Sequence, residues 1–103
     1  MARFFKNEKN SSEGIQNAIN RGFYTTNHEI FASDFDSNLS GSTLVTVILK
    51  NNKLYCANVG DSRAVLARYE HGFFKAIPLS VDQKPSLESE KNRVIKAGGR
   101  IEK

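Results

Sequence analysis

The stretch from Ser40 to Arg68 contains the longest apolar, β-branched runs in the sequence and therefore limits the possible folds most strongly. Within it, Thr43–Leu49 is almost continuously apolar, which is typical of a strand buried on both faces. Leu54–Val59 and Ala64–Arg68 predict two further strands, and Asn51-Asn52 favours a tight turn between the first two. The strand residues expected to be largely buried are Val45, Val47, Leu49 and Leu66.

Between the second and third of these strands, the chain is expected to reverse at Gly60-Asp61-Ser62, within Asn58–Ala64. Gly60 permits the dihedral angles of such a reversal, and the carboxylate of Asp61 is then exposed at the end of a rigid sheet. Because Mg²⁺ and Mn²⁺ prefer oxygen donors, Asp61 is a candidate metal ligand. The alternative is that Asp61 only caps the hairpin through its own side chain, and the residues alone leave both interpretations open.

A helix is expected before the strands. Apolar residues recur at helical spacing and predict an amphipathic helix from Gly14 to about Ala32, with Asn10 or Ser11 as its cap. Its apolar stripe is expected to pack on the sheet, with Phe23 over the strands. Residues 1–13 are interpreted as a tail or the end of a preceding element.

After the strands, Phe73–Ile77 predicts a fourth strand that ends at Pro78. Ser86 is the expected cap of a second helix from about Leu87 to Ala97, which Gly98 ends. Helix, antiparallel four-strand meander and second helix define an α+β fold.

Composition excludes several classes of function. A length of 103 residues predicts one domain at most. The net charge of +4 comes from basic residues interleaved with acidic ones, so neither nucleic acid nor a membrane is an expected partner. The single cysteine, Cys56, lies within a strand, which favours a small core residue in a reducing compartment, the cytoplasm or the nucleus. Two histidines and one cysteine cannot form a zinc site, and no nucleophilic triad is evident.

Several ordered motifs resemble one family. The segments Ser40-Gly41-Ser42-Thr43 and Asn58-Val59-Gly60-Asp61-Ser62-Arg63-Ala64 are followed by Leu79-Ser80-Val81-Asp82-Gln83-Lys84-Pro85 and then by Glu90, Arg93 and Ala97-Gly98-Gly99. Together they resemble the central part of a metal-dependent (type-2C) serine/threonine protein phosphatase, over roughly residues 15–101. Two departures are Gln83, where the family usually has His, and Asn92, where Glu is common.

The resemblance implies a partial four-layer α/β/β/α sandwich. It also implies that residues 14–103 are the central part of an incomplete phosphatase catalytic domain. In this family, two Mg²⁺ or Mn²⁺ ions activate a water that attacks phosphoserine or phosphothreonine. The family's Asp-Gly-His-Gly, Asp-Gly and Asp-Asn segments, which hold those ions, are absent here, so no catalytic residue can be assigned. Asp61 matches the position associated with a third, weaker metal, and Arg63 is expected to pair with a nearby carboxylate.

Two interpretations of function remain open. The chain is either the central fragment of a protein phosphatase, from a truncated or trimmed coding sequence and inactive alone, or a non-catalytic, pseudophosphatase-like scaffold or decoy. A phosphoprotein substrate is expected only if the domain is complete, and the sequence defines no oligomeric state. Coding sequence before Met1 and after Lys103 would separate the two interpretations, because only the first predicts the missing metal-binding segments there.

Overall fold

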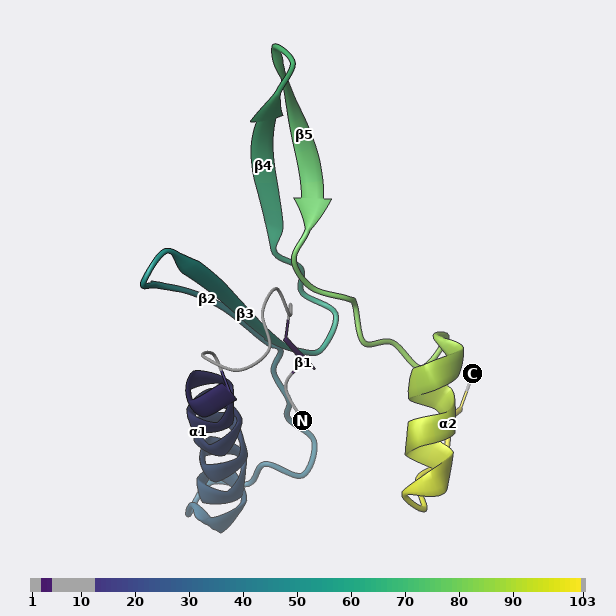
Figure 1. Cartoon of the computed structure of the whole chain (residues 1–103). Helices are drawn as coiled ribbons and strands as arrows, with labels where there is room; N and C mark the ends of the chain where they lie inside the picture. Colours follow the sequence, from purple (N-terminus) through teal and green to yellow (C-terminus); the bar gives the residue numbers. More distant parts are fainter. Residues whose placement is uncertain (1–2, 5–12, 103) are drawn as a thin grey trace.

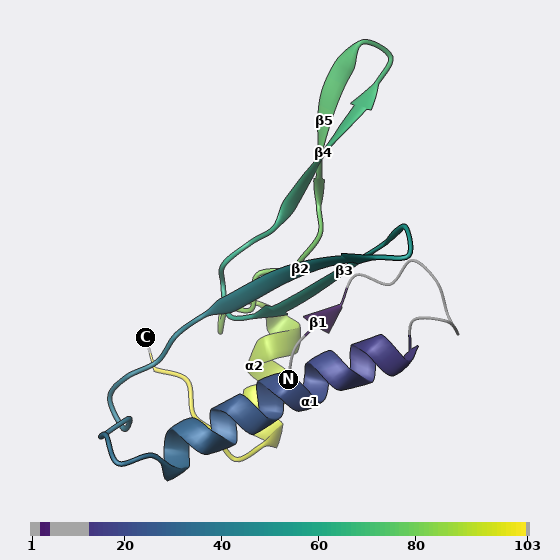
Figure 2. The same ribbon diagram turned by 90° about the vertical axis from the view of Figure 1, so that its left-hand side faces the viewer.

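The computed structural model describes residues 3–4 and 13–102, and within these ranges it confirms the α+β class. Two helices and five strands are arranged as Figures 1 and 2 show. In chain order the elements are β1 (Arg3–Phe4), α1 (Glu13–Ala32), β2 (Leu44–Lys50), β3 (Lys53–Val59), β4 (Val65–Glu70), β5 (Phe73–Pro78) and α2 (Glu88–Lys96).

The first sheet has β3 at its centre, with β2 on one side and β1 on the other, all antiparallel. The register pairs Leu44 with Val59 and Lys50 with Lys53, so the turn has only two residues. Asn51 and Asn52 occupy it with φ of 53° and 60°, left-handed values that asparagine tolerates better than most residues. The predicted turn is thus confirmed, whereas β1 was not predicted from the sequence.

The second sheet consists of β4 and β5 alone. They are antiparallel, with Val65 opposite Pro78 at one end and Glu70 opposite Phe73 at the other. This hairpin projects away from the first sheet in both views (Figures 1 and 2). The four predicted strands therefore form two separate hairpins rather than one continuous meander, and the expected reversal between two paired strands at Asn58–Ala64 is wrong. The physical reason is a competing partner, because the N–H groups of Leu79 and Gln83, which follow β5, donate to the carbonyl oxygens of Ala64 and Gly60 in the connection between β3 and β4.

Burial is concentrated in the central strand. The buried apolar residues of the described chain are Tyr55, Cys56, Ala57 and Leu79, and three of these lie in β3. The prediction that Val47 and Leu49 are buried is wrong, because they are 50% and 73% exposed. Side chains of a strand point to the two faces of its sheet, and the described element in closest contact with β2 is β3, which lies beside it and not over its faces. Val45 and Leu66 are half-buried.

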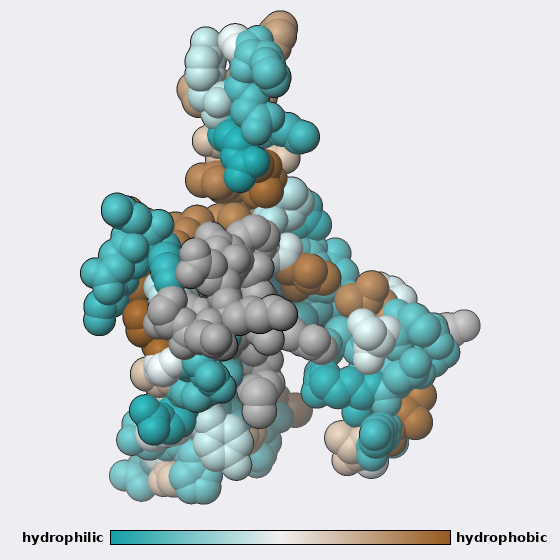
Figure 3. All heavy atoms as spheres, in the orientation of Figure 1, coloured by the Kyte–Doolittle hydropathy of each residue, from teal (hydrophilic) through white to brown (hydrophobic). Residues whose placement is uncertain are grey.

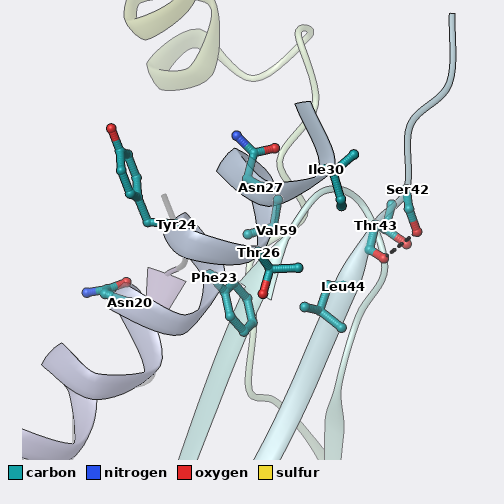
Figure 4. A pocket seen from close by; sticks show the side chains of 10 residues that line it. All are labelled: Asn20, Phe23, Tyr24, Thr26, Asn27, Ile30, Ser42, Thr43, Leu44 and Val59. Atoms are coloured by element: carbon teal, nitrogen blue, oxygen red, sulfur yellow. Dashed lines mark hydrogen bonds between the residues drawn. The ribbon is translucent and has the colours of Figure 1, made fainter. Parts of the chain in front are cut away.

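The first helix follows its prediction in extent but packs loosely. None of the residues of α1 is buried, and Phe23 is half-buried. A cavity of about 390 Å³ separates α1 from the first sheet. Figure 4 shows Phe23 and Ile30 of α1 lining it together with Leu44 and Val59. The predicted cap at Asn10 or Ser11 lies outside the described residues.

The second helix begins one residue later than predicted. Leu87 occupies the N-cap position without a side-chain hydrogen bond to the helix, so the predicted cap at Ser86 is wrong. The end of the helix agrees with prediction, since Gly98 has φ of 85° and its N–H bonds to the carbonyl oxygen of Ile95. Neither described helix has the length and hydropathy needed to cross a lipid bilayer.

The chain is extended for its length. Its Cα radius of gyration is 16.2 Å, whereas a compact domain of about 100 residues has a value of about 13 Å. Many large apolar side chains are exposed, including Leu39, Phe73 and Phe74 at 101%, 75% and 74%. Figure 3 shows apolar surface at the base of the β4–β5 hairpin and beside α2. These faces have the composition of a core rather than of a water-facing surface.

Candidate functional site

The candidate site is the connection between β3 and β4, residues 60–64, which we call the Asp61 turn. Gly60 opens it with φ of 102°, a left-handed value that an L-residue adopts only with strain. A Cβ atom at this position would also lie 2.6 Å from Cγ2 of Thr43. Both the dihedral angle and the close approach of Thr43 therefore require glycine before Asp61.

Residues 79–83, which follow β5 and which we call the 79–83 segment, run beside this turn. The N–H of Gln83 donates to the carbonyl oxygen of Gly60 at 2.9 Å, and the N–H of Leu79 donates to the carbonyl oxygen of Ala64 at 2.9 Å. The N–H of Ala64 in turn donates to Oγ of Ser80 at 3.0 Å. Both ends of the turn are thereby held against one segment.

Two side-chain amides strengthen this attachment. Nδ2 of Asn58, a residue with no solvent exposure, donates to the carbonyl oxygens of Gly60 at 3.0 Å and Val81 at 3.1 Å. The side chain of Gln83 accepts from the N–H of Gly60 at 3.0 Å and donates to the carbonyl oxygen of Asn58 at 3.3 Å. These contacts place buried polar groups in hydrogen bonds and fix the backbone that leads into Asp61.

The residues after Asp61 are held independently. The hydroxyl oxygens of Ser62 and Thr43 are 2.7 Å apart and share a hydrogen bond. Arg63 donates from Nε and Nη2 to the two carboxylate oxygens of Asp82, at 2.9 and 2.7 Å. The predicted pairing of Arg63 with a nearby carboxylate is therefore confirmed. Hydrogen bonding from Arg63 lowers the pKa of Asp82, and the same contact raises the pKa of Arg63.

Asp61 itself is exposed, as predicted. Its carboxylate makes no hydrogen bond or ion pair with the described residues, so the alternative in which it caps the turn through its own side chain has no support among them. The turn is thus fixed on both sides of a carboxylate that is open to an external ligand. The carboxylate oxygens are suitable ligands for a hard cation such as Mg²⁺.

The described residues can supply one carboxylate ligand to a metal site, but not a cluster of such ligands. Nowhere in residues 3–4 and 13–102 do three or more His, Cys, Asp or Glu side chains gather as a possible metal site. The two carboxylate oxygens of Asp82, the acidic residue of the 79–83 segment, are both bonded to Arg63. Among the described residues, Asp61 therefore has no cluster of acidic, histidine or cysteine side chains with which to share a metal ion.

The other residues singled out from the sequence have structural roles. Cys56 is 1% exposed, and burial raises the pKa of its thiol, which agrees with a core residue rather than a nucleophile. Glu90 is buried and bonds to Arg93 at 2.7 Å. Sequence reasoning missed the roles of Asn58 and Gln83, although both lie in the motifs that carried the resemblance. An asparagine that follows Tyr-Cys-Ala in a buried strand was the available signal, because buried amides need partners.

Comparison with known proteins identifies a family. The sequence profile of the family described as Protein phosphatase 2C matches residues 1–103. Among relatives, Probable protein phosphatase 2C 35 of Arabidopsis thaliana is 40% identical over 89 residues, which cover 86% of this chain and 26% of that protein. Protein phosphatase 2C homolog 2 of Hypocrea jecorina is 39% identical over 99 residues, covering 95% of this chain and 22% of that protein.

A third relative, Protein phosphatase 2C homolog 3 of Schizosaccharomyces pombe, is 45% identical over 87 residues, which cover 84% of this chain and 20% of that protein. The chain thus spans about a quarter or less of the length of these curated relatives. No solved structure matches it. The match of the family profile to the entire sequence shows that the chain belongs to the protein phosphatase 2C family.

Proposed function

We propose that residues 14–103 form the central part of a catalytic domain that removes phosphate from phosphoserine or phosphothreonine in proteins. The observation that carries this proposal is the family match over residues 1–103. The exposed apolar faces support it, because further parts of a domain would cover them. No observation favours a non-catalytic scaffold.

The proposed role of Asp61 is to supply one carboxylate to a Mg²⁺ or Mn²⁺ ion. Its support is the fixed turn, the exposure of the side chain and its lack of partners among the described residues. When bound, such ions activate water and stabilise charge on phosphate oxygens. The contribution of this chain is to hold Gly60 and Ser62 so that the backbone from which the side chain of Asp61 extends keeps one position. The reducing environment favoured by Cys56 supports a cytoplasmic or nuclear site of action.

A segment-swap protein tests the proposal. In it, this chain replaces the matching segment of Protein phosphatase 2C homolog 3 of Schizosaccharomyces pombe. We expect Mn²⁺-dependent release of phosphate from a phosphothreonine peptide, with the unaltered relative as positive control. Asp61→Asn should raise the half-saturating Mn²⁺ concentration by at least about tenfold, whereas Asp34→Asn, at an exposed position in the α1–β2 connection, should leave it unchanged.

Two results would overturn parts of the proposal separately. A folded segment-swap protein without activity, beside an active parent, would show that this chain cannot serve as a catalytic-domain segment. An active protein in which Asp61→Asn and Asp34→Asn behave alike would remove Asp61 from the metal site while leaving the family function in place.

A further inference from the structure

The side chain of Gln83 has an unusual hydrogen-bonding pattern with β3. Its Oε1 accepts from the N–H of Gly60 and its Nε2 donates to the carbonyl oxygen of Asn58, two residues earlier. A residue on a parallel neighbouring strand bonds in the same way, to the carbonyl before and the N–H after the residue it faces. The amide of Gln83 thus extends the sheet by one peptide-like group at the point where β3 ends.

The main chain of Gln83 adds a third contact to the same place. Its N–H donates to the carbonyl oxygen of Gly60, so both the N–H and the carbonyl of Gly60 are bonded to one residue. The carbonyl carbon of Gly60 is bonded directly to the nitrogen of Asp61. Fixing the peptide groups around Gly60 therefore limits the directions in which the carboxylate of Asp61 can point.

A primary amide is suited to this contact because it carries a donor and an acceptor on one edge. A carboxylate lacks the donor, and the two nitrogens of an imidazole point away from each other. The acceptor it satisfies belongs to Asn58, which has no solvent exposure, so loss of the donor would leave a buried carbonyl with one partner fewer. Glutamine at this position makes both contacts at once.

We propose that Gln83 is a positioning residue for Asp61, acting through the peptide groups of Gly60 rather than touching the metal or substrate. The inference rests on the proposed function, in which Asp61 binds a divalent cation. It assigns the 79–83 segment a role in metal affinity that is separate from its role in folding.

The first experiment measures amide hydrogen exchange by NMR in the full chain. Gln83→Met removes donor and acceptor at nearly constant length, and should accelerate exchange of the Gly60 N–H by about tenfold, as expected when one hydrogen bond no longer protects it. Amides of the β2–β3 ladder should keep their rates. Gln83→Glu retains an acceptor for Gly60 and should protect its N–H better than Gln83→Met does. Asn92→Ala, on the exposed face of α2, is the matched control.

The second experiment measures Mn²⁺ binding to the segment-swap protein from the electron paramagnetic resonance signal of the free ion, without reference to activity. Gln83→Met should weaken severalfold the binding at the site that Asp61→Asn removes, and Asn92→Ala should not. A purely structural role would instead accelerate exchange in the β2–β3 ladder and leave Mn²⁺ affinity in the folded protein unchanged.

The outcomes separate the two proposals. Unchanged Mn²⁺ affinity in Gln83→Met, together with a clear loss of binding in Asp61→Asn, would overturn the positioning role alone. Unchanged binding in Asp61→Asn would overturn the metal role of Asp61 and the positioning role with it. If Gln83→Met does not fold, both measurements are made on Gln83→Ala, which also removes the donor and the acceptor and should therefore accelerate exchange of the Gly60 N–H. A wild-type exchange rate at Gly60 in that variant would overturn the inference.

Discussion

The guanidinium group of Arg63 meets the carboxylate of Asp82 in two parallel hydrogen bonds, Nε to Oδ1 at 2.9 Å and Nη2 to Oδ2 at 2.7 Å. The pair joins the Asp61 turn to the 79–83 segment two residues beyond Asp61. Paired, bidentate contacts of this kind fix orientation as well as distance. The side chain of Asp82 is 17% exposed and that of Arg63 is 58% exposed, so water screens the pair in part.

We expect this pair to make stability depend on pH. The hydrogen bonds from Arg63, aided by the charges of Arg63 and Lys84, lower the pKa of Asp82 in the folded state. A lowered folded-state pKa means that the stabilising contribution is present above the unfolded-state value of about 3.9 and is lost as pH falls through the folded-state value. Asp82→Asn should therefore lower the urea midpoint most at about pH 7, and its effect should shrink as the pH falls below about 3.9. Asp34→Asn is the control, and an effect of Asp82→Asn that does not shrink at low pH would contradict the assignment.

The second prediction concerns the close approach of Gly60 and Thr43. Gly60→Ala introduces both an unfavourable φ and a Cβ atom 2.6 Å from Cγ2 of Thr43. Gly72→Ala introduces the unfavourable φ alone, because nothing lies within 4 Å of its Cβ position. Strain at a left-handed residue costs about 1 kcal/mol or more, so both variants should be destabilised and Gly60→Ala should be the worse.

A double-mutant cycle isolates the clash at this position. Thr43→Ser removes Cγ2 and keeps the hydroxyl that bonds to Ser62. Thr43→Ser should therefore cost less in the Gly60→Ala background than in the wild type, when free energies of unfolding are measured by urea denaturation. Strictly additive effects would show that Thr43 does not restrict position 60.

The local elements were predictable from the sequence, and their assembly was not. The Asn51-Asn52 turn, both helices and all four long strands follow from short-range pattern, and so does the exposure of Asp61. The prediction that Val47 and Leu49 are buried was wrong because apolar composition does not reveal whether another element covers the face of a strand. The contacts of Asn58 with Val81 and of Gln83 with Gly60 each span 23 residues, and no local pattern encodes such pairs. The fixed turn around Asp61 therefore required the structure.

The third prediction compares two apolar positions in two contexts. Tyr55 is 4% exposed, so Tyr55→Ala should cost about 3 kcal/mol or more in the full chain. Val47 is 50% exposed, so Val47→Ala should cost less than about 1 kcal/mol there. If further parts of the catalytic domain cover β2, the cost of Val47→Ala should rise in the segment-swap protein. Equal costs in the two proteins would show that this face of β2 stays exposed.

The last prediction is that the 103-residue chain alone hydrolyses no phosphoester. Metal-assisted attack on phosphorus by a two-metal site requires several carboxylates that converge on ions about 3.5–4 Å apart. In the described part of the chain, Asp61 stands without such neighbours, and Asp82 is engaged by Arg63. One exposed carboxylate leaves water as most of the coordination shell of Mg²⁺, so its occupancy should be low. The measurement is phosphate release from phosphoserine and phosphothreonine peptides by the purified chain in excess Mn²⁺, with the segment-swap protein as positive control. Metal-dependent turnover by the chain alone that disappears in Asp61→Asn, but not in Asp34→Asn, would show that these residues complete a catalytic site without the remainder of the domain.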